Sequence, residues 1–207
     1  ATVTAAPDFA YRYALRFGGD LGRYELKSLE YGLVAAEPVR ARTITAFESA
    51  ISQFGVLKPG YGLAECSVAV AAWPRGRHCE IRIDASGLVT CGPPLPGIAV
   101  SIRDDDDHEL PCGVVGHICV ASPSQTSGYF RDVEATTALF TADGFVRTGD
   151  MGKVDEDGLL YVVARAKEVI IVAGRTVSPM ELEEVSEGID GVDAAMALGI
   201  DRGTDAG

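Results

Sequence analysis

The spacing of apolar residues predicts helices in the first part of the chain. Residues 42–54 carry apolar side chains three and four positions apart, on one face of a helix: Ile44, Phe47, Ile51 and Phe54. Gly55 is expected to end this helix. Residues 7–17 predict a shorter helix that begins beside Asp8, and the apolar run 30–36 is typical of a buried strand. These elements predict an α/β arrangement for residues 1–87.

From residue 88 onward the pattern changes to short apolar runs separated by turn residues. Six runs are expected to be strands: residues 88–91, 98–103, 114–120, 145–148, 159–163 and 169–172. Turn signals lie among them at Gly92-Pro93-Pro94, Asp143-Gly144 and Asp157-Gly158. The pattern predicts a small, mostly antiparallel sheet or barrel attached to the α/β layer.

The C-terminal stretch predicts one helix and one further strand. Ser178, Pro179 and Glu181 have the form of a capping box with proline at the first helical position, so a helix is expected over residues 179–187. Residues 192–200 are expected to form a strand.

Composition and charge argue against several classes of protein. Thirty acidic and 18 basic residues give a net charge of −12, which disfavours nucleic acid and anionic membrane surfaces as partners. Five cysteines without a C-x-x-C pair indicate neither a disulfide framework nor a zinc ribbon, so we interpret them as reduced thiols of a cytoplasmic protein. The longest apolar runs, 159–164 and 169–173, are too short for a transmembrane segment, and residue 1 does not begin a signal peptide.

Two short motifs carry side chains suited to binding a nucleotide. Tyr61 stands beside Gly62, so its ring face is open to a flat base, and Glu65 supplies hard oxygens for Mg²⁺ four residues later. A packed tyrosine and a solvated glutamate explain this motif equally well. In Thr148-Gly149-Asp150, the carboxylate can accept hydrogen bonds from both ribose hydroxyls, although a match of three residues has little weight alone.

Two other segments have suitable chemistry but also ordinary explanations. Arg165, Lys167 and Arg175 form a cationic cluster within residues 164–175, which suits a phosphate, or else marks a solvated edge strand. Residues 35–40 place two alanines at the end of a predicted strand, where the backbone can approach a ligand closely, or where the chain simply turns.

Two apparent metal motifs do not have the required spacing. Asp104 to Asp107 resemble a calcium loop, but its sixth position is Glu109 rather than glycine, so a solvated hairpin turn is the preferred interpretation. A zinc site can be drawn from four residues whose spacing fits no established ligand pattern, namely His108, Cys112, His117 and Cys119.

The order and spacing of these segments resemble the adenylate-forming superfamily of acyl ligases and adenylation domains, and most of all the fatty acyl-AMP ligases. The resemblance runs over nearly the whole chain, in residues 6–11, 36–40, 61–65, 92–97, 148–150 and 165–175. It implies the latter part of a large N-terminal domain, with an α/β portion (1–87) and a β-rich distorted barrel (88–166). A hinge and an incomplete α+β C-terminal domain (167–207) would follow.

The resemblance also implies roles for particular residues. The adenine of ATP would lie between Tyr61, with Gly62 beside it, and a loop formed by Ala36, Glu37 and Pro38. Asp150 and Arg165 would hold the ribose, and Glu65 would bind a catalytic Mg²⁺. Phe9 would lie near the acyl carboxylate, Lys167 would be the catalytic residue at the hinge, and Arg175 would lie on a loop that changes partners as the domains rotate.

The implied reaction is ATP-dependent activation of a fatty acid to acyl-AMP with release of pyrophosphate. The acyl group would then pass to a phosphopantetheine thiol of an acyl carrier protein or polyketide synthase. Three alternatives stay open: an acyl-CoA synthetase, an amino-acid adenylation domain, and a non-catalytic homologue that binds a nucleotide or a protein partner.

The sequence departs from the family pattern in three places. Ala64 stands where most of the superfamily has threonine, as the fatty acyl-AMP ligase branch commonly does. The segment 73–89 is shorter than the insertion of that branch, and residues 81–84 are a candidate remnant of it. A phosphate-binding loop and a C-terminal catalytic lysine are not found, so we expect the 207-residue chain alone not to complete adenylation.

Overall fold

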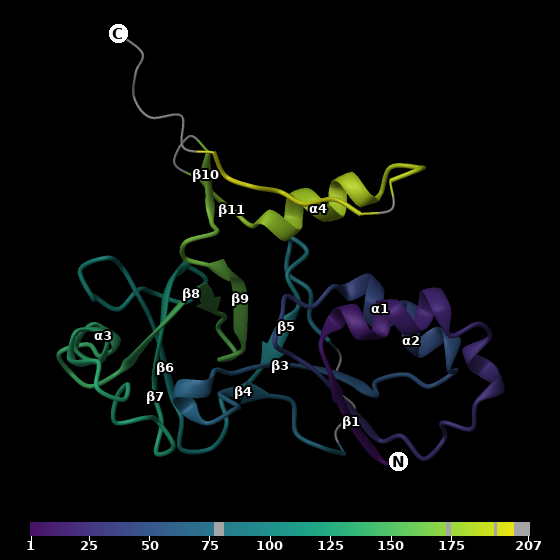
Figure 1. Ribbon diagram of the computed structural model, residues 1–207, viewed down its shortest axis with the longest axis horizontal. Coiled ribbons are helices and arrows are strands. Elements are labelled where there is room, and N and C mark those ends of the chain that lie inside the picture. The colour runs from purple at the N-terminus through teal and green to yellow at the C-terminus, as the bar shows by residue number, and fades with distance from the viewer. Residues whose placement is uncertain (77–80, 173–174, 193, 201–207) are drawn as a thin grey trace, which may run out of the picture.

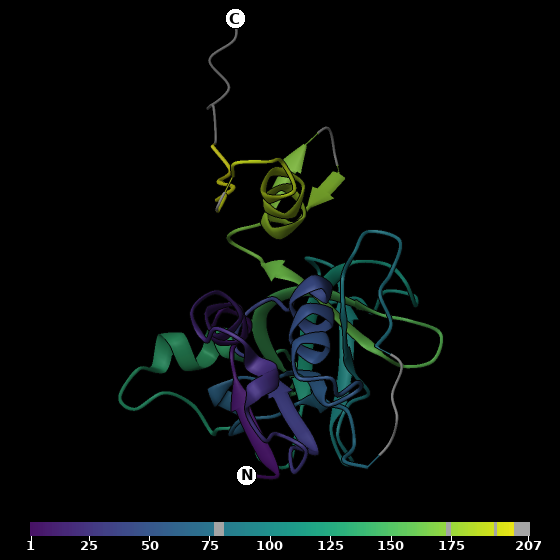
Figure 2. The same cartoon turned by 90° about the vertical axis from the view of Figure 1, so that its right-hand side faces the viewer.

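The computed structural model describes residues 1–76, 81–172, 175–192 and 194–200. Its N-terminal part is a four-stranded sheet in the order β1-β2-β3-β4, in which the first three strands are parallel and β4 is antiparallel to β3. The strands are β1 (Val3–Ala6), β2 (Tyr31–Val34), β3 (Leu57–Tyr61) and β4 (Ala71–Ala72). Two helices, α1 (Asp8–Phe17) and α2 (Ala41–Ala50), lie side by side on this part (Figures 1 and 2).

Helix α2 packs through the apolar face that the sequence predicts, with one correction, whereas α1 packs through Tyr11 and leaves Phe9, Tyr13 and Phe17 exposed. Tyr11 of α1 meets Phe47 of α2 edge to face, with 5.0 Å between the ring centroids. The expected extension of α2 to Phe54 is wrong. Ser52 adopts a φ of 53°, which ends the helix, and Phe54 beyond it is 69% exposed instead of packed on the helical face.

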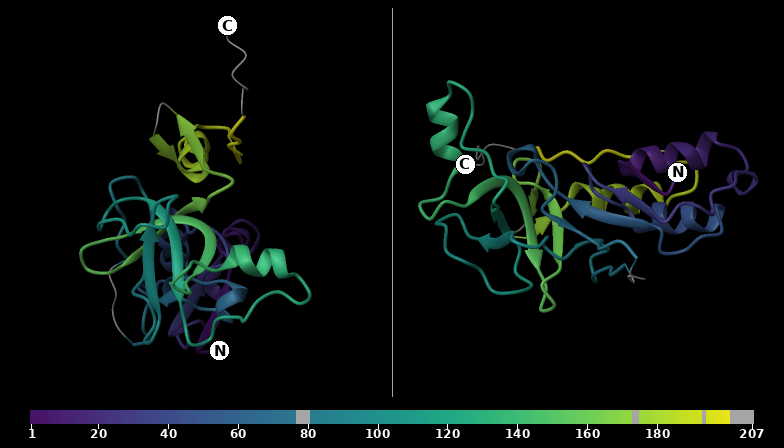
Figure 3. Two further views of the ribbon diagram at one scale, coloured as in Figure 1. Left: turned by 90° about the vertical axis from the view of Figure 1, so that its left-hand side faces the viewer. Right: turned by 90° about the horizontal axis from the view of Figure 1, so that it is seen from below.

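The second part is a five-stranded antiparallel sheet in the order β5-β9-β8-β7-β6, as the short apolar runs predict. Its strands are β5 (Thr90–Gly92), β6 (Ala99–Arg103), β7 (Gly116–Ala121), β8 (Val146–Val154) and β9 (Leu160–Arg165). A short helix, α3 (Val133–Leu139), projects from this sheet (Figure 3). The sequence did not predict α3, or β1, β3 and β4.

The third part consists of a hairpin and one helix above the two larger sheets (Figure 1). The hairpin strands β10 (Ile170–Val172) and β11 (Arg175–Val177) are antiparallel, and α4 covers Pro179–Glu187 as predicted. The capping-box prediction is wrong, because the Ser178 hydroxyl donates to the carbonyl of Val163 at 3.0 Å rather than capping α4.

The strand expected over residues 192–200 is also wrong for its described residues. The segment runs beside α4, where the N–H groups of Ala195 and Ala197 donate to the carboxylates of Glu187 and Glu183, each at 3.2 Å. These side-chain acceptors satisfy backbone donors that a neighbouring strand would otherwise satisfy. Residue 193 of that segment, and residues 77–80 and 173–174 of the predicted motifs, lie outside the described residues.

The remaining described features are two short helices, the 104–107 turn and the free cysteines. Two single-turn 3₁₀ helices, η1 (Leu21–Arg23) and η2 (Ala64–Cys66), complete the described elements. Residues 104–107 form a turn between β6 and β7, and the cysteines that the structure describes are all free. Within the described ranges, no helix has the length and apolar character needed to span a membrane.

Candidate functional site

A cavity of about 520 Å³ lies where the two larger sheets and α4 meet. Its volume is within the range of about 300–1,000 Å³ that is usual for small-ligand pockets. The sequence-predicted residues among its lining are Ala36, Glu37, Pro38, Tyr61, Gly62, Asp150 and Arg165. Residues that are up to about 130 positions apart in the sequence therefore line the same cavity.

Three polar side chains from different strands are joined at this cavity. The Tyr61 hydroxyl, at the end of β3, donates to Oδ2 of Asp150 at 2.5 Å. Asp150 on β8 faces Arg165 on β9 in the strand register, and Nε of Arg165 lies 3.2 Å from its Oδ1. The antiparallel pairing of β8 and β9 therefore sets the ion pair, and β3 brings the aromatic ring to it.

The surroundings of this group raise the pKa of both Tyr61 and Asp150. Burial raises the pKa of Asp150 above its ordinary value, an effect that the Tyr61 hydroxyl and Arg165 only partly offset. The negative charge of Glu65 adds to the increase in the pKa of Asp150, so Glu65 lies within electrostatic reach. Burial and the neighbouring carboxylate also raise the pKa of Tyr61.

Two glycines give the site its backbone geometry. A β-carbon on Gly62 would lie 1.7 Å from the carbonyl oxygen of Val68, so only glycine allows the chain after Tyr61 to fold back so closely. Gly149 has a φ of 75° within β8, which is a left-handed conformation that glycine adopts without a steric penalty. It directly precedes Asp150 and its carbonyl accepts from the Ala166 N–H at 2.9 Å.

Glu65 lies near this group but does not line the cavity. Its carboxylate accepts a hydrogen bond from the Tyr129 hydroxyl at 2.6 Å. Among the described residues, no three acidic, histidine or cysteine side chains form a metal cluster, and the His108, Cys112, His117 and Cys119 set is no exception. Mg²⁺ is often bound by one or two carboxylates together with substrate phosphates, so a single glutamate fits a metal that arrives with a nucleotide.

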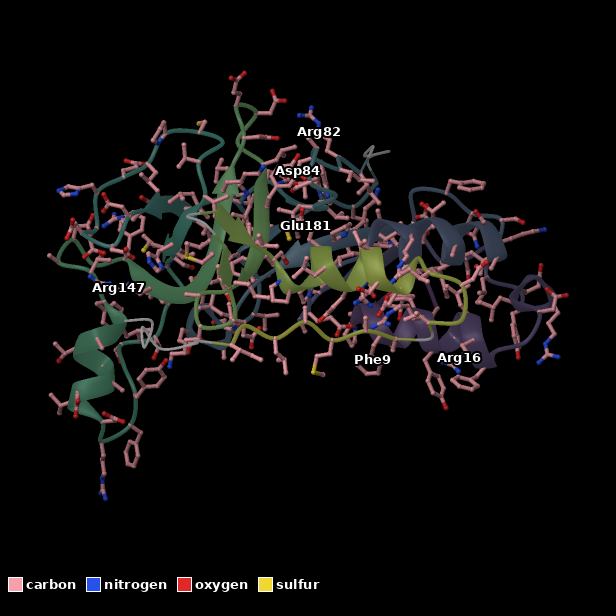
Figure 4. All side chains as sticks on the ribbon, turned by 90° about the horizontal axis from the view of Figure 1, so that it is seen from above. Phe9, Arg16, Arg82, Asp84, Arg147 and Glu181 are labelled. Carbon is pink, nitrogen blue, oxygen red and sulfur yellow. The ribbon has the colours of Figure 1, made fainter. Side chains whose placement is uncertain are left out.

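The loop of Ala36, Glu37 and Pro38 forms the wall opposite the polar group. Phe9, the expected acyl-carboxylate contact, does not line the cavity; its side chain is 55% exposed and points outward from α1 (Figure 4). Its backbone N–H, however, donates to the carboxylate of Glu37. Phe9 is thus connected to the cavity wall through its main chain.

The expected hinge lies between the second sheet and the hairpin. Lys167 is exposed in the turn after β9 and does not line the cavity. Arg175 was expected on a loop, but it is the first residue of strand β11, where its backbone pairs with that of Val172. The loop prediction is therefore wrong for Arg175.

Sequence reasoning gave no individual role to the cavity residues that come from α1, from the segment before α2 and from α4. Arg12, Arg40, Met180, Glu183 and Glu187 all line the cavity. Arg40 lies 3.1 Å from Glu183 and 3.8 Å from Glu187, so α4 is ion-paired to the segment before α2. The sequence offered only the spacing of Arg12, four residues after Asp8 on one helical face, as a signal.

The fold and the cavity define the chain as a member of the adenylate-forming enzymes. The model of the AMP-binding enzyme family matches residues 1–130, and the chain belongs to that family. The structure of ATP-bound MatB from Rhodopseudomonas palustris superposes with a TM-score of 0.83 at 28% identity, covering 97% of this chain and 38% of that one.

The curated relatives are named for different activities. A fatty acid–[acyl-carrier-protein] ligase, ScoC of Streptomyces coeruleorubidus, is 37% identical over 67% of the chain. A long-chain-fatty-acid–CoA ligase of Salmonella typhimurium is 38% identical over 72%, and the nonribosomal peptide synthetase apvA of Aspergillus terreus is 33% identical over 82%. The matches span only 26%, 25% and 19% of these relatives' lengths, respectively.

Proposed function

We propose that this chain is the nucleotide-binding part of an enzyme that activates a fatty acid with ATP. The observation that carries the proposal is the single cavity shared by Tyr61, the Asp150–Arg165 pair and the Ala36 loop. In the reaction, a carboxylate oxygen of the fatty acid attacks the α-phosphorus of ATP. Pyrophosphate leaves with the electrons of the broken P–O bond, and a mixed acyl-AMP anhydride is formed.

The cavity residues have chemistry that suits the parts of AMP. The open ring face of Tyr61 and the Ala36–Pro38 wall would hold the adenine, with Gly62 leaving room beside the ring. Asp150 would accept hydrogen bonds from the ribose hydroxyls in place of the Tyr61 hydroxyl, with Arg165 keeping its charge balanced. Glu65 would hold Mg²⁺, which supplies charge neutralisation at the phosphates when bound.

We propose that residues 1–87, 88–166 and 167–207 are successive parts of one active site rather than independent units. The two larger sheets form the walls, and α4 covers them through its ion pairs with Arg40. Lys167, exposed in the turn between these parts, would be the hinge about which the cover rotates, and Phe9 would approach the acyl carboxylate. A cytoplasmic location stays a prediction.

We propose an acyl carrier protein, in a polyketide-type pathway, as the acceptor of the acyl group. The resemblance to fatty acyl-AMP ligases and the similarity to ScoC support this choice. The similarity to a long-chain-fatty-acid–CoA ligase favours coenzyme A as the second candidate. The full-length protein, charged with acyl-AMP and offered each thiol separately, distinguishes them by which thioester forms.

Titration of the protein with ATP tests the nucleotide-binding part of the proposal. We expect saturable binding that Asp150→Asn weakens by about tenfold, since one hydrogen-bonded charged group contributes about 1.5 kcal/mol or more. Asp157→Asn, in an exposed turn outside the cavity lining, serves as the matched control. Equal affinities for ATP in the wild type and Asp150→Asn would contradict the ribose assignment.

Turnover is tested separately, with fatty-acid-dependent pyrophosphate exchange. We expect the full-length protein to catalyse the exchange and the 207-residue chain alone to be inactive. Exchange by the isolated chain would contradict the expectation that these 207 residues alone do not complete adenylation. Absence of exchange by the full-length protein with every chain length tested would contradict the proposed reaction.

A further inference from the structure

A residue in an unfavourable conformation stands in the cavity wall. Ala36 has a φ of 75°, in the left-handed region that disfavours residues with a β-carbon. Such a conformation persists only where surrounding contacts hold it, and it is common at ligand-binding sites. The contacts that hold the segment from Ala36 to Arg40 are therefore part of what shapes the cavity.

One of these contacts comes from a buried carboxylate on the neighbouring helix. Asp8, the first residue of α1, is only 1% exposed. Its carboxylate accepts hydrogen bonds from the Arg40 N–H at 3.1 Å, the Thr43 hydroxyl at 3.2 Å and Nε of Arg12 at 2.9 Å. Arg40 is the N-cap of α2 and provides no side-chain cap of its own. Asp8 thus supplies from α1 a bond that a capping box normally supplies within one helix.

A second hydrogen bond joins the start of α1 to the 36–40 loop, and here the donor is on α1 and the acceptor is in the loop. The N–H of Phe9, next to Asp8, donates to the carboxylate of Glu37. Glu37 and Arg40 stand near the two ends of the loop, and both are thereby tied to the first turn of α1. On the other side of Ala36, the N–H of Ala35 donates to the Ala6 carbonyl at 3.4 Å, so the chain is held both before and after Ala36.

We propose that Asp8 is a positioning residue, which holds the 36–40 loop in the shape that a bound nucleotide meets and orients Arg12 at the cavity. Glu37 acts as the second tie rather than as a direct contact of the base. The identity of the ligand rests on the proposed function, whereas the positioning of the loop does not. Loss of the tie lowers the fraction of molecules with a binding-competent loop, and the apparent affinity falls by that fraction.

The test compares Asp8→Asn with Asp132→Asn. Asp132 also accepts a backbone N–H at a helix start, from Ala135 at 2.9 Å, but outside the cavity lining. An amide has one acceptor oxygen and cannot accept from the Arg40 N–H, the Thr43 hydroxyl and Arg12 together. We therefore expect Asp8→Asn to weaken ATP binding about tenfold, measured by calorimetry, and to accelerate amide hydrogen exchange in residues 36–40. Asp132→Asn is expected to change ATP affinity less than twofold and to leave exchange of those residues unaltered.

Rescue separates positioning from general destabilisation. Glycine adopts the conformation of Ala36 without a steric penalty, so Ala36→Gly added to Asp8→Asn should recover about threefold of the lost affinity. The affinity of Ala36→Gly alone is measured as well, so that the recovery is obtained as the coupling between the two substitutions. A general loss of stability would not be repaired by this change, so failure of the rescue overturns the positioning role.

The remaining outcomes are also decisive. Unchanged ATP affinity or unchanged exchange in Asp8→Asn overturns the proposal. If Asp8→Asn does not fold, Glu37→Ala carries the same test at the more accessible tie, because it removes the acceptor of the Phe9 N–H; the expected loss is about threefold, and no loss there overturns the proposal. If the wild type does not bind ATP, the proposed function fails, and hydrogen exchange of the 36–40 loop alone decides whether Asp8 positions it.

Discussion

The hydroxyl of Tyr61 donates to the buried carboxylate of Asp150 at 2.5 Å, so its removal gives a well-defined perturbation. Tyr61→Phe keeps the ring and deletes only this donor. A hydrogen bond to a charged group contributes about 1.5–3 kcal/mol, and Asp150 keeps its ion pair with Arg165. We therefore expect the free energy of unfolding at pH 7 to fall by about 2 kcal/mol.

The pH dependence of this loss follows from the pKa of Asp150. Burial is the largest influence and raises the pKa in the folded protein, so the associated stability is complete below the unfolded pKa and is lost as pH rises through the folded one. The Tyr61 hydroxyl opposes the increase by favouring the charged carboxylate. Once acid has protonated Asp150, the Tyr61 hydroxyl forms only a neutral hydrogen bond with it, so the loss in Tyr61→Phe should shrink to about 1 kcal/mol.

Urea denaturation followed by Trp73 fluorescence measures both values. With an m-value of about 2 kcal/mol/M, the midpoint should shift by about 1 M at pH 7 and by about half as much at a second, acidic pH that protonates Asp150. Tyr13→Phe, whose ring is 63% exposed on α1, is the control and should change stability by less than about 0.5 kcal/mol. Equal shifts at the two pH values would refute the assigned coupling between Tyr61 and ionised Asp150.

Two further substitutions test the backbone and the α4 contact. Gly62→Ala places a β-carbon 1.7 Å from the Val68 carbonyl oxygen and should cost about 3 kcal/mol or prevent folding, whereas Gly158→Ala, with open space around it, should cost about 1–2 kcal/mol in thermal denaturation. Burial opposes ionisation of Glu187, but the Ala195 N–H and nearby arginines outweigh it and lower its pKa, so its contribution is present at neutral pH and lost in acid. Glu187→Gln should therefore flatten the acid side of the stability profile, and Glu181→Gln, exposed on α4, should not.

The sequence predicted those elements whose signals are local. The helix over residues 179–187 and the antiparallel character of the second sheet follow from proline, turn residues and apolar spacing. Strand β3 was missed because it contains Lys58, Pro59 and Gly60, which are poor strand formers. Its pairing with β2, in which Lys58 faces Leu33, supplies the backbone partners that overcome this preference.

The same distinction explains what could be predicted of the candidate site. Tyr61 and Asp150 were identified because each stands in a recognisable short motif. Asp8 and Arg40 stand in segments that resemble the family, but neither was given a role, because the buried hydrogen bond between them joins positions 32 residues apart and leaves no local pattern. Supporting residues of this kind are defined by tertiary packing, so apolar spacing and motif matches do not detect them.

The walls of the cavity and its cover are held by different kinds of interaction. Asp150 and Arg165 stand on paired strands, whereas α4 is joined to Arg40 through ion pairs with Glu183 and Glu187. Among the described residues, Nε of buried Arg40 has no hydrogen-bond acceptor, and such an unsatisfied donor costs about 1–3 kcal/mol. This cost falls on the contact between α4 and Arg40, so separating the cover from the walls loses less than it would if Arg40 were fully hydrogen-bonded.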